Sequence, residues 1–273
     1  MNNISVIIRT KDSQSTIEDC IVSIRNQSFA VSEIIIVDSG SNDKTLEIAA
    51  SHNCKILKYQ SNGLYNYSKA LNMGIAEARG DFLLIMSSHT RFLGNNDLNE
   101  MIVIFQEWKQ IVSVSYNRTG LPDYDNSGTS KYKVSSFGNF DGLAMYNLCS
   151  LIKKQDWEIY HFNENMPTAE DQEWAKYFIR RLNRVSIIIY NKCVFYSNSH
   201  YNYQKDINEY FAIGRYVDNK WFSKIKIIEL IMNLFGALFK FQFSKSNFYF
   251  KLIVKIIRYK LTGFSEITFY RKK

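Results

Sequence analysis

Short apolar runs alternate with stretches of helical periodicity through the first half of the chain. Near-continuous apolar runs are typical of strands covered on both faces, and they lie at residues 4–8, 34–37 and 82–86, with a shorter run at 55–59. Between them apolar residues recur at helical spacing, which predicts helices over residues 17–24, 46–50 and 70–78. Strands that alternate with helices predict an α/β fold with a largely parallel sheet.

The remainder of the chain is less regular. Its pattern predicts helices over residues 98–108 and 174–182, and strands over residues 111–116, 185–190 and 193–196. Residues 118–139 are polar and irregular, and a loop of that length in a compact domain is often a binding loop. From Asn202 onward the chain is helical, aromatic and basic in character.

Two of the expected helices begin with the spacing of a capping box, in which a side chain accepts from a backbone N–H three residues on. Ser15 and Glu18 have this spacing before the first helix, and Thr168 and Asp171 have it before the helix near Trp174. The pattern therefore predicts side-chain caps at both places.

Composition indicates a globular protein with anionic partners. The chain has 273 residues with 46% hydrophobic content, enough for one large domain or two small ones. The formal net charge is +8, and much of the excess lies in the C-terminal tail. The four cysteines form no Cys-x-x-Cys pair, which argues against a thiolate zinc site and indicates buried thiols in a reducing compartment. The first residues show no secretory signal pattern, so we expect a cytoplasmic protein.

Polar side chains follow three of the expected strands. They are Arg9, Thr10, Asp38, Ser87, Ser88 and His89. In open α/β sheets ligands bind outside the carboxyl ends of the strands. We therefore expect these side chains to line one binding crevice.

Four short motifs occur in order along the chain. They are Ser39-Gly40-Ser41-x-Asp43-x-Thr45, Lys69-Ala70-Leu71-Asn72-x-Gly74, Ser87-Ser88-His89 and Glu170-Asp171-x-x-Trp174. Together they resemble the family 2 glycosyltransferases, which share the nucleotide-sugar-binding GT-A fold, and the resemblance runs from about Ser5 to about Gly214. The segment around His200 is similar to the rhamnosyltransferase-like branch of capsule and O-antigen synthesis. The resemblance implies a GT-A catalytic domain over residues 1–203 and a helical extension over residues 204–273.

Glu170 and Asp171 are the carboxylates that the resemblance assigns to catalysis. An inverting transfer needs a base behind the anomeric carbon to accept the proton of the acceptor hydroxyl. Asp171 is expected to be that base, with Glu170 as the second candidate. A carboxylate at a helix start is expected to have its basicity lowered by the helix dipole. The alternative is that Asp171 only caps the helix.

The resemblance assigns a further set of residues to donor binding, namely Arg9, Thr10, Asp38, Lys69, Ser87 and Ser88. Asp38 is expected to hydrogen-bond the nucleoside base or ribose, although Asp-Ser-Gly-Ser is also ordinary turn sequence. Arg9 and Lys69 carry charge that can neutralise a diphosphate, and the alternative for Lys69 is a solvated surface side chain.

The run Ser87-Ser88-His89 stands where this fold usually carries Asp-x-Asp, whose carboxylates hold a divalent cation. Both acidic positions are replaced, which departs from the family pattern. The resemblance leaves His89 and His200 as ligands for Mn²⁺ or Mg²⁺, although carboxylate suits hard cations better than imidazole does. The alternatives are direct contact of His89 with phosphate, and a surface or stacking role for His200.

The resemblance implies an inverting glycosyltransferase that moves a sugar from a nucleotide-diphosphate donor to a saccharide or lipid-linked acceptor in bacterial surface polysaccharide synthesis. The alternative is a non-catalytic, membrane-associated nucleotide-sugar-binding protein that has lost Asp-x-Asp. Residues 221–273 interleave basic with aromatic and aliphatic side chains, which is typical of a segment in a membrane interface, although helices that pack on the catalytic domain remain an alternative. We expect a peripheral protein at the inner face of the cytoplasmic membrane. We expect no nucleic-acid partner, because no recognised motif accompanies the charge.

Overall fold

The computed structural model describes residues 3–60, 65–118, 132–166, 168–197 and 203–262. Its strands are β1 (Ile4–Thr10), β2 (Glu33–Asp38), β3 (Lys55–Lys58), β4 (Phe82–Ser87), β5 (Thr90–Arg91), β6 (Ile111–Arg118), β7 (Tyr132–Ser135), β8 (Cys149–Lys153) and β9 (Val185–Tyr196). Its helices are α1 (Ile17–Arg25), α2 (Thr45–Ser51), α3 (Tyr67–Ala76), α4 (Asp97–Glu107), α5 (Lys154–Ile159), α6 (Glu170–Arg181), α7 (Tyr203–Ala212), the π-helix η1 (Ile213–Val217), the 3₁₀-helix η2 (Asn219–Phe222), α8 (Lys224–Phe239) and α9 (Phe243–Thr262).

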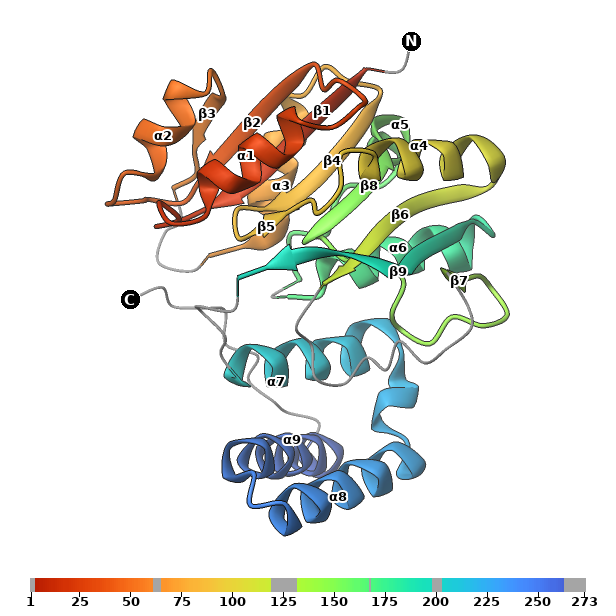
Figure 1. Cartoon of the computed structure of the whole chain (residues 1–273). Coiled ribbons are helices and arrows are strands. Elements are labelled where there is room, and N and C mark those ends of the chain that lie inside the picture. Colours follow the sequence, from red (N-terminus) through yellow and green to blue (C-terminus); the bar gives the residue numbers. More distant parts are fainter. Residues whose placement is uncertain (1–2, 61–64, 119–131, 167, 198–202, 263–273) are drawn as a thin grey trace.

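One sheet organises the molecule, with the strand order β3-β2-β1-β4-β8-β6-β9-β5 and β7 beside β9 (Figure 1). The half formed by β3, β2, β1 and β4 is parallel, as the alternation of strands and helices predicted. In the other half β8 runs antiparallel to both β4 and β6, and β5 and β7 run antiparallel to β9. The predicted α/β fold is therefore confirmed, with a sheet that is mixed rather than parallel throughout.

Helices cover both faces of the sheet because the strands are apolar on both sides. Along β1, the side chains of Ile4, Val6 and Ile8 join a core with α1, α2 and α4. Ile7 points to the other face, where it joins a core with α3, α5 and α6. This alternation follows from the two-residue period of a strand.

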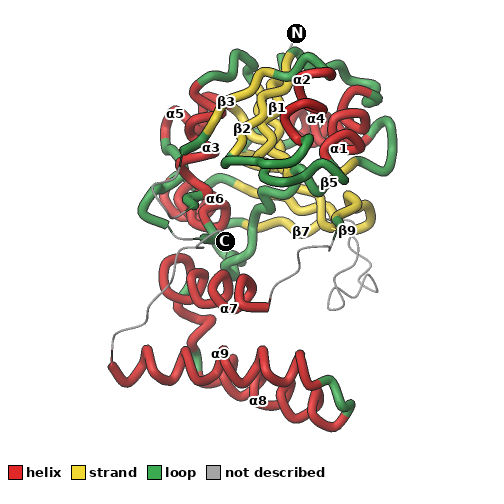
Figure 2. Tube along the Cα trace, turned by 90° about the vertical axis from the view of Figure 1, so that its left-hand side faces the viewer, coloured by secondary structure: helices red, strands yellow, loops and turns green. Residues whose placement is uncertain are grey.

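The chain beyond β9 forms a helical layer at one end of the molecule, as predicted. The end of α7 and η1 pack into the core beneath α6 through Ala212, Ile213 and Val217. A third core joins α7 and η2 to the antiparallel pair α8 and α9. Both views place α8 and α9 farthest from the sheet (Figures 1 and 2). None of the described helices combines the length and the apolar character needed to cross a bilayer.

Three local predictions were wrong. Residues 185–190 and 193–196 form one strand, β9, rather than two. Residues 132–135 of the expected irregular segment form β7, because they pair with β9, while residues 119–131 lie outside the described part of the chain. Neither capping box forms, since Thr16 and Ala169 are the N-caps and neither makes a side-chain cap.

Candidate active site

The predicted meeting of three strand ends is observed. β2, β1 and β4 are neighbours in the sheet, with Thr10 opposite Asp38 and Arg9 opposite Ser87. The Ser88 N–H donates to the Arg9 carbonyl at 3.4 Å, so the turn after β4 is tied to the end of β1. These residues therefore lie together at the carboxyl ends of three neighbouring strands, which we call the sheet edge. Ligands bind at this place in open α/β sheets.

Asp38 is buried at the end of β2, and its carboxylate is engaged by the turn that follows. The Gly40 N–H donates to Oδ2 at 3.0 Å, and the Ser41 hydroxyl donates to Oδ1 at 2.5 Å. Gly40 has a φ of +89°, which glycine adopts without a Cβ penalty. The turn role of Asp38 is therefore observed, and its contact with a nucleoside stays a prediction.

The two serines after β4 also have partners within the protein. The buried Ser88 hydroxyl lies 2.9 Å from the Ser13 hydroxyl. The Ser87 hydroxyl accepts from the backbone N–H of His89 at 3.4 Å. These contacts shape the turn, and donor contacts by either serine stay predictions.

His89 has its ring oriented by Thr16. Its Nδ1 lies 3.2 Å from Thr16 Oγ1, and that hydroxyl donates to the Ser13 carbonyl at 3.4 Å. The donor and acceptor roles in the contact with Thr16 depend on the tautomer of the imidazole. A metal-ligating histidine commonly bonds a neighbour through its other ring nitrogen, and the contact with Thr16 is compatible with that arrangement. The Ser197 N–H donates to the His89 carbonyl at 2.9 Å, so the end of β9 runs beside this turn, whereas His200 lies outside the described residues.

The side chains present fit a cation only in part. Within the described ranges no group of three or more His, Cys, Asp or Glu side chains is arranged to hold a metal ion. His89 offers one nitrogen, so a cation at this turn would need oxygen ligands from elsewhere, and a donor diphosphate supplies such oxygens. The arrangement is compatible with a cation that binds together with the donor.

Lys69 and Thr10 are placed differently from each other. Lys69 lies in the first turn of α3, with an exposed side chain, and its backbone N–H is capped by the Asn66 side chain at 2.9 Å. Thr10 is buried, and its hydroxyl has no hydrogen-bond partner among the described residues. Buried hydroxyl groups are usually bonded, so Thr10 is a position where a ligand could supply the missing contact.

Arg9 reaches from the end of β1 to the start of α6. Its Nη1 lies 3.3 Å from Glu170 Oε1, and the side chains are 12% and 7% exposed. Its guanidinium also lies over the ring of Tyr67, 4.9 Å from the centroid. Burial is the largest influence and by itself would lower the pKa of Arg9, but Glu170, together with Tyr65, Tyr67 and Asp171, raises the pKa on balance. Arg9 is therefore a permanent positive charge held against a candidate catalytic carboxylate.

Asp171 is buried beside Glu170 in the first turn of α6. Its Oδ1 accepts from the Gln172 N–H at 2.8 Å, and its Oδ2 accepts from the Asn147 N–H at 3.1 Å. Burial raises the pKa of Asp171 well above its usual value, and the negative charges of Glu170 and then Glu209 raise it further, against the two backbone hydrogen bonds. The pKa of Asp171 is therefore raised on balance, and the expected effect of the helix dipole stays a prediction.

Asn147 contacts both carboxylates and was not identified from the sequence. Its backbone N–H donates to Asp171, and its side-chain amide donates to Glu170 Oε1 at 3.2 Å. It lies just before β8, a strand without a distinct apolar pattern, and no motif surrounds it. Glu209 was also missed as a neighbour of Asp171, because α7 was assigned to the extension.

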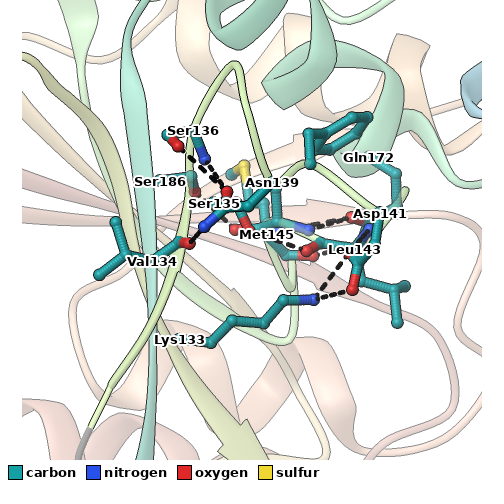
Figure 3. A network of polar contacts seen from close by, with 12 residues as sticks. Lys133, Val134, Ser135, Ser136, Asn139, Asp141, Leu143, Met145, Gln172 and Ser186 are labelled. Atoms are coloured by element: carbon teal, nitrogen blue, oxygen red, sulfur yellow. Dashed lines mark hydrogen bonds and ion pairs between the residues drawn. The ribbon is translucent and has the colours of Figure 1, made fainter.

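The segment before Asn147 is held by a polar network (Figure 3). Gln172 Oε1 accepts from the Ala144 N–H at 2.8 Å, and the Gln172 amide donates to the Met145 carbonyl. Gln172 thus holds the segment that leads to Asn147, and the backbone N–H of Asn147 donates to Asp171. The carboxylate is positioned by its own helix and by the chain packed against that helix.

The chain matches glycosyl transferase family 2 over residues 5–152. It is 28% identical, over 66% of its length, to the dolichyl N-acetyl-alpha-D-glucosaminyl phosphate 3-beta-D-2,3-diacetamido-2,3-dideoxy-beta-D-glucuronosyltransferase of Methanococcus voltae. It is 24% identical, over 69% of its length, to the poly(ribitol-phosphate) beta-N-acetylglucosaminyltransferase TarS of Staphylococcus aureus. The chain spans 62% and 34% of the lengths of these two relatives.

Solved structures agree on the fold. The mannosyltransferase PcManGT from Pyrobaculum calidifontis, in complex with GDP-Man and Mn²⁺, has a TM-score of 0.64 at 12% identity, covering 97% of this chain and 88% of that one. Residues 1–349 of S. aureus TarS have a TM-score of 0.58 at 16% identity, covering 96% and 92%. The predicted GT-A fold is confirmed. The family match over residues 5–152 covers more than half of the chain, so the chain belongs to glycosyl transferase family 2.

Proposed function

We propose that the chain is an inverting glycosyltransferase that uses a nucleotide-diphosphate sugar donor. The observation that carries the proposal is the buried pair at the start of α6, where Arg9 forms an ion pair with Glu170 and the pKa of Asp171 is raised. Two adjacent carboxylates in different environments take different roles, as in other acid–base sites. Family membership supports transfer of a sugar, and the pair supplies the proton acceptor that inversion needs.

In the proposed step Asp171 accepts the proton of the acceptor hydroxyl as that oxygen forms its bond to the anomeric carbon. The bond from the anomeric carbon to the diphosphate oxygen breaks, and the nucleoside diphosphate leaves with the electron pair. The raised pKa of Asp171 makes it a stronger base than an exposed aspartate. Glu170 and Asn147 are positioning residues, since they hold Arg9 and Asp171 in place.

The donor would bind at the shared strand edge. The proposed donor-binding residues are Arg9, Thr10, Asp38, Lys69, Ser87 and Ser88. Structural neighbours that hold UDP, UDP-GlcNAc and GDP-Man with Mn²⁺ support a nucleotide sugar as the donor. His89 and His200 would hold a divalent cation, Mn²⁺ or Mg²⁺, which would offset the diphosphate charge.

The acceptor we propose is a saccharide or a lipid-linked saccharide of a bacterial surface polysaccharide, used at the inner face of the cytoplasmic membrane. One relative is named for a dolichyl phosphate sugar and another for poly(ribitol-phosphate), so lipid-linked and polymeric acceptors both occur among similar proteins. The sheet edge and the α6 carboxylates belong to residues 1–203, which we propose as the catalytic domain, with residues 204–273 as its helical extension.

A second candidate is a non-catalytic nucleotide-sugar-binding protein, which the absence of carboxylates at Ser87 and His89 favours. Incubation of the purified chain with a panel of nucleotide sugars and saccharide acceptors tests both. Release of nucleoside diphosphate with a product of inverted anomeric configuration, seen by NMR, supports the transferase. Donor binding without turnover for any acceptor supports the second candidate, and a product of retained configuration contradicts inversion.

A further inference from the structure

Helix α8 is apolar on two opposite sides, and only one side is covered. Leu230 and Ala237 are buried against the neighbouring helices, with Ile227 and Leu234 partly buried beside them. The other side exposes an apolar stripe at intervals of three and four residues, made of Ile225, Ile228, Met232, Phe235 and Phe239. Phe235 is 65% exposed and Phe239 is 87% exposed. A soluble helix normally turns polar residues to water, so this stripe indicates a surface with a binding partner.

Helix α9 also has a buried side and an exposed apolar side. Leu252 and Ile256 are buried in the core with α7. A second exposed stripe runs along its outer side, made of Phe243, Phe250, Val254, Ile257 and Leu261. Phe241, in the turn between the two helices, is 79% exposed. We call these exposed residues of α8, α9 and their connection the hairpin face.

The hairpin that carries this face is strongly basic. Between residues 224 and 262 the sequence has eight Lys and Arg residues and one acid, Glu229, for a formal charge of +7. Glu229 is itself paired with Lys226 at 2.7 Å. Almost all of the net charge of the chain therefore lies on the element that exposes the apolar stripes.

We propose that the hairpin face docks on the surface of an anionic lipid bilayer, with the stripes among the acyl chains and the lysines at the headgroups. This rests on the membrane partner of the proposed function and assigns it to named residues. Apolar side chains and clustered basic residues together define an interfacial helix. A second copy of the chain is the poorer occupant, because two faces of charge +7 repel each other.

The position of the face suits this role. α8 and α9 lie at the end of the molecule away from the sheet (Figure 2), so the sheet edge stays open to a soluble donor while the hairpin lies on the bilayer. α7 connects the hairpin to the site, since Lys255 of α9 donates to Asn208 at 2.8 Å and Glu209 raises the pKa of Asp171. A lipid-linked acceptor would thus reach the catalytic carboxylates from the membrane side.

The test is flotation of the full chain with vesicles of phosphatidylcholine and phosphatidylglycerol, compared with vesicles of phosphatidylcholine alone. We expect binding to the anionic vesicles that weakens as ionic strength rises. The double variant Phe235→Ser/Phe239→Ser should bind about tenfold more weakly or worse, because each phenylalanine loses its burial in lipid. Phe137→Ser is the matched control, since Phe137 is 53% exposed outside the hairpin and should bind like the parent.

Charge is tested in the same way. Lys240→Glu/Lys251→Glu should weaken binding to anionic vesicles, whereas the exposed Lys109→Glu outside the hairpin should not. Melting temperatures confirm that the variants are folded. Equal flotation of the parent and the phenylalanine double variant, or no flotation of the parent, would overturn the proposal. If the parent chain is a dimer in solution and the phenylalanine double variant is a monomer, the face binds a second copy of the chain instead.

Donor titration by calorimetry without vesicles separates this proposal from the proposed function. Flotation without donor binding would leave the docking surface standing and contradict the transferase. Donor binding without flotation would contradict the docking surface and leave the transferase standing.

Discussion

Arg9 at the end of β1 and Glu170 at the start of α6 form an ion pair of 3.3 Å, although they are 161 positions apart in the sequence. The Arg9 carbonyl also accepts from the Ser88 N–H, in the turn where a diphosphate is expected. Arg9 therefore connects the proposed donor site at the strand ends with the carboxylates of α6. A donor that draws on the charge of Arg9 would change the electrostatic field at Asp171.

Replacing Arg9 should destabilise the protein strongly. Arg9→Met leaves Glu170 buried without its cation, and breaking a buried pair typically costs about 3–5 kcal/mol. The double variant Arg9→Met/Glu170→Gln should be more stable than Arg9→Met in urea unfolding, because the unpaired charge is gone. Arg79→Met is the control, since Arg79 pairs with Glu33 at 3.4 Å but is 86% exposed, and it should change stability by roughly 0–1 kcal/mol. A double variant no more stable than Arg9→Met would contradict the pairing.

Asp171→Asn should reduce transfer by about 10²–10⁴-fold while donor affinity stays near that of the parent. The change removes the proton acceptor and leaves the volume of the side chain unchanged. Steady-state rates and calorimetric donor titration measure the two effects separately. Glu173→Gln on the same helix is the control, because Glu173 bonds Tyr160 and contacts neither carboxylate, and it should keep most of the activity. Near-normal turnover of Asp171→Asn would refute its role as the base.

The acid limb of the pH–rate profile should depend on the neighbours of Asp171. Asp171 accepts a proton only when ionised, so kcat/KM rises with pH through its raised pKa. Glu170→Gln removes a negative charge, which lowers the pKa of Asp171 and moves the limb to lower pH. Glu209→Gln should move it in the same direction by a smaller amount. Complete loss of transfer in Glu170→Gln at every pH would instead make Glu170 the base.

Activity should require Mn²⁺ or Mg²⁺ and fall at acidic pH, because protonation of a ligating imidazole competes with the metal. Metal and donor should bind cooperatively, since the diphosphate completes a shell that His89 only begins. His89→Ala should lose that coupling in calorimetric titrations. His52→Ala is the control, because His52 contacts Glu18 at the surface. Full activity in excess chelator would refute the metal, and the basic side chains would then neutralise the diphosphate.

Gly74 should tolerate no side chain. A Cβ at this position would lie 2.7 Å from Val37 and 2.8 Å from Ile7, because α3 packs closely on β1 and β2 here. Gly74→Ala should therefore lower stability by about 1–3 kcal/mol through overpacking. Gly236→Ala, in α8, meets no atom within 4 Å and should raise stability by roughly 0.5–1 kcal/mol. Calorimetric melting of the two variants measures both changes in stability. Equal changes would contradict the close packing at Gly74.

The sequence was sufficient for the parallel half of the sheet and for the residues at its edge. β1, β2 and β4 are apolar runs that end in polar residues, and such runs are visible because strand burial on both faces requires them. The order of the motifs along the chain identified one protein family, and with it the importance of Asp38, the turn at Ser88 and the pair at Glu170. These features depend on local pattern, which a single sequence records directly.

Elements whose pairing depends on distant segments could not be read in this way. β7 became a strand only through β9, and Asn147 reached the carboxylates only because β8 lies between β4 and β6. The capping boxes did not form because Thr16 and Ala169, rather than Ser15 and Thr168, occupy the N-cap positions of α1 and α6. Local spacing predicts the contacts that a side chain can make, and packing selects among them.

By itself, the sequence determined the α/β class, the strand-end residues and the basic, aromatic character of the C-terminal helices, because periodicity and composition are local properties. Only the tertiary structure decided that Arg9 forms an ion pair with Glu170 and that the pKa of Asp171 is raised. It also decided which side of α8 stays uncovered. Burial, opposing charges and exposed faces arise when distant segments pack together, and the free energy of each depends on that packing.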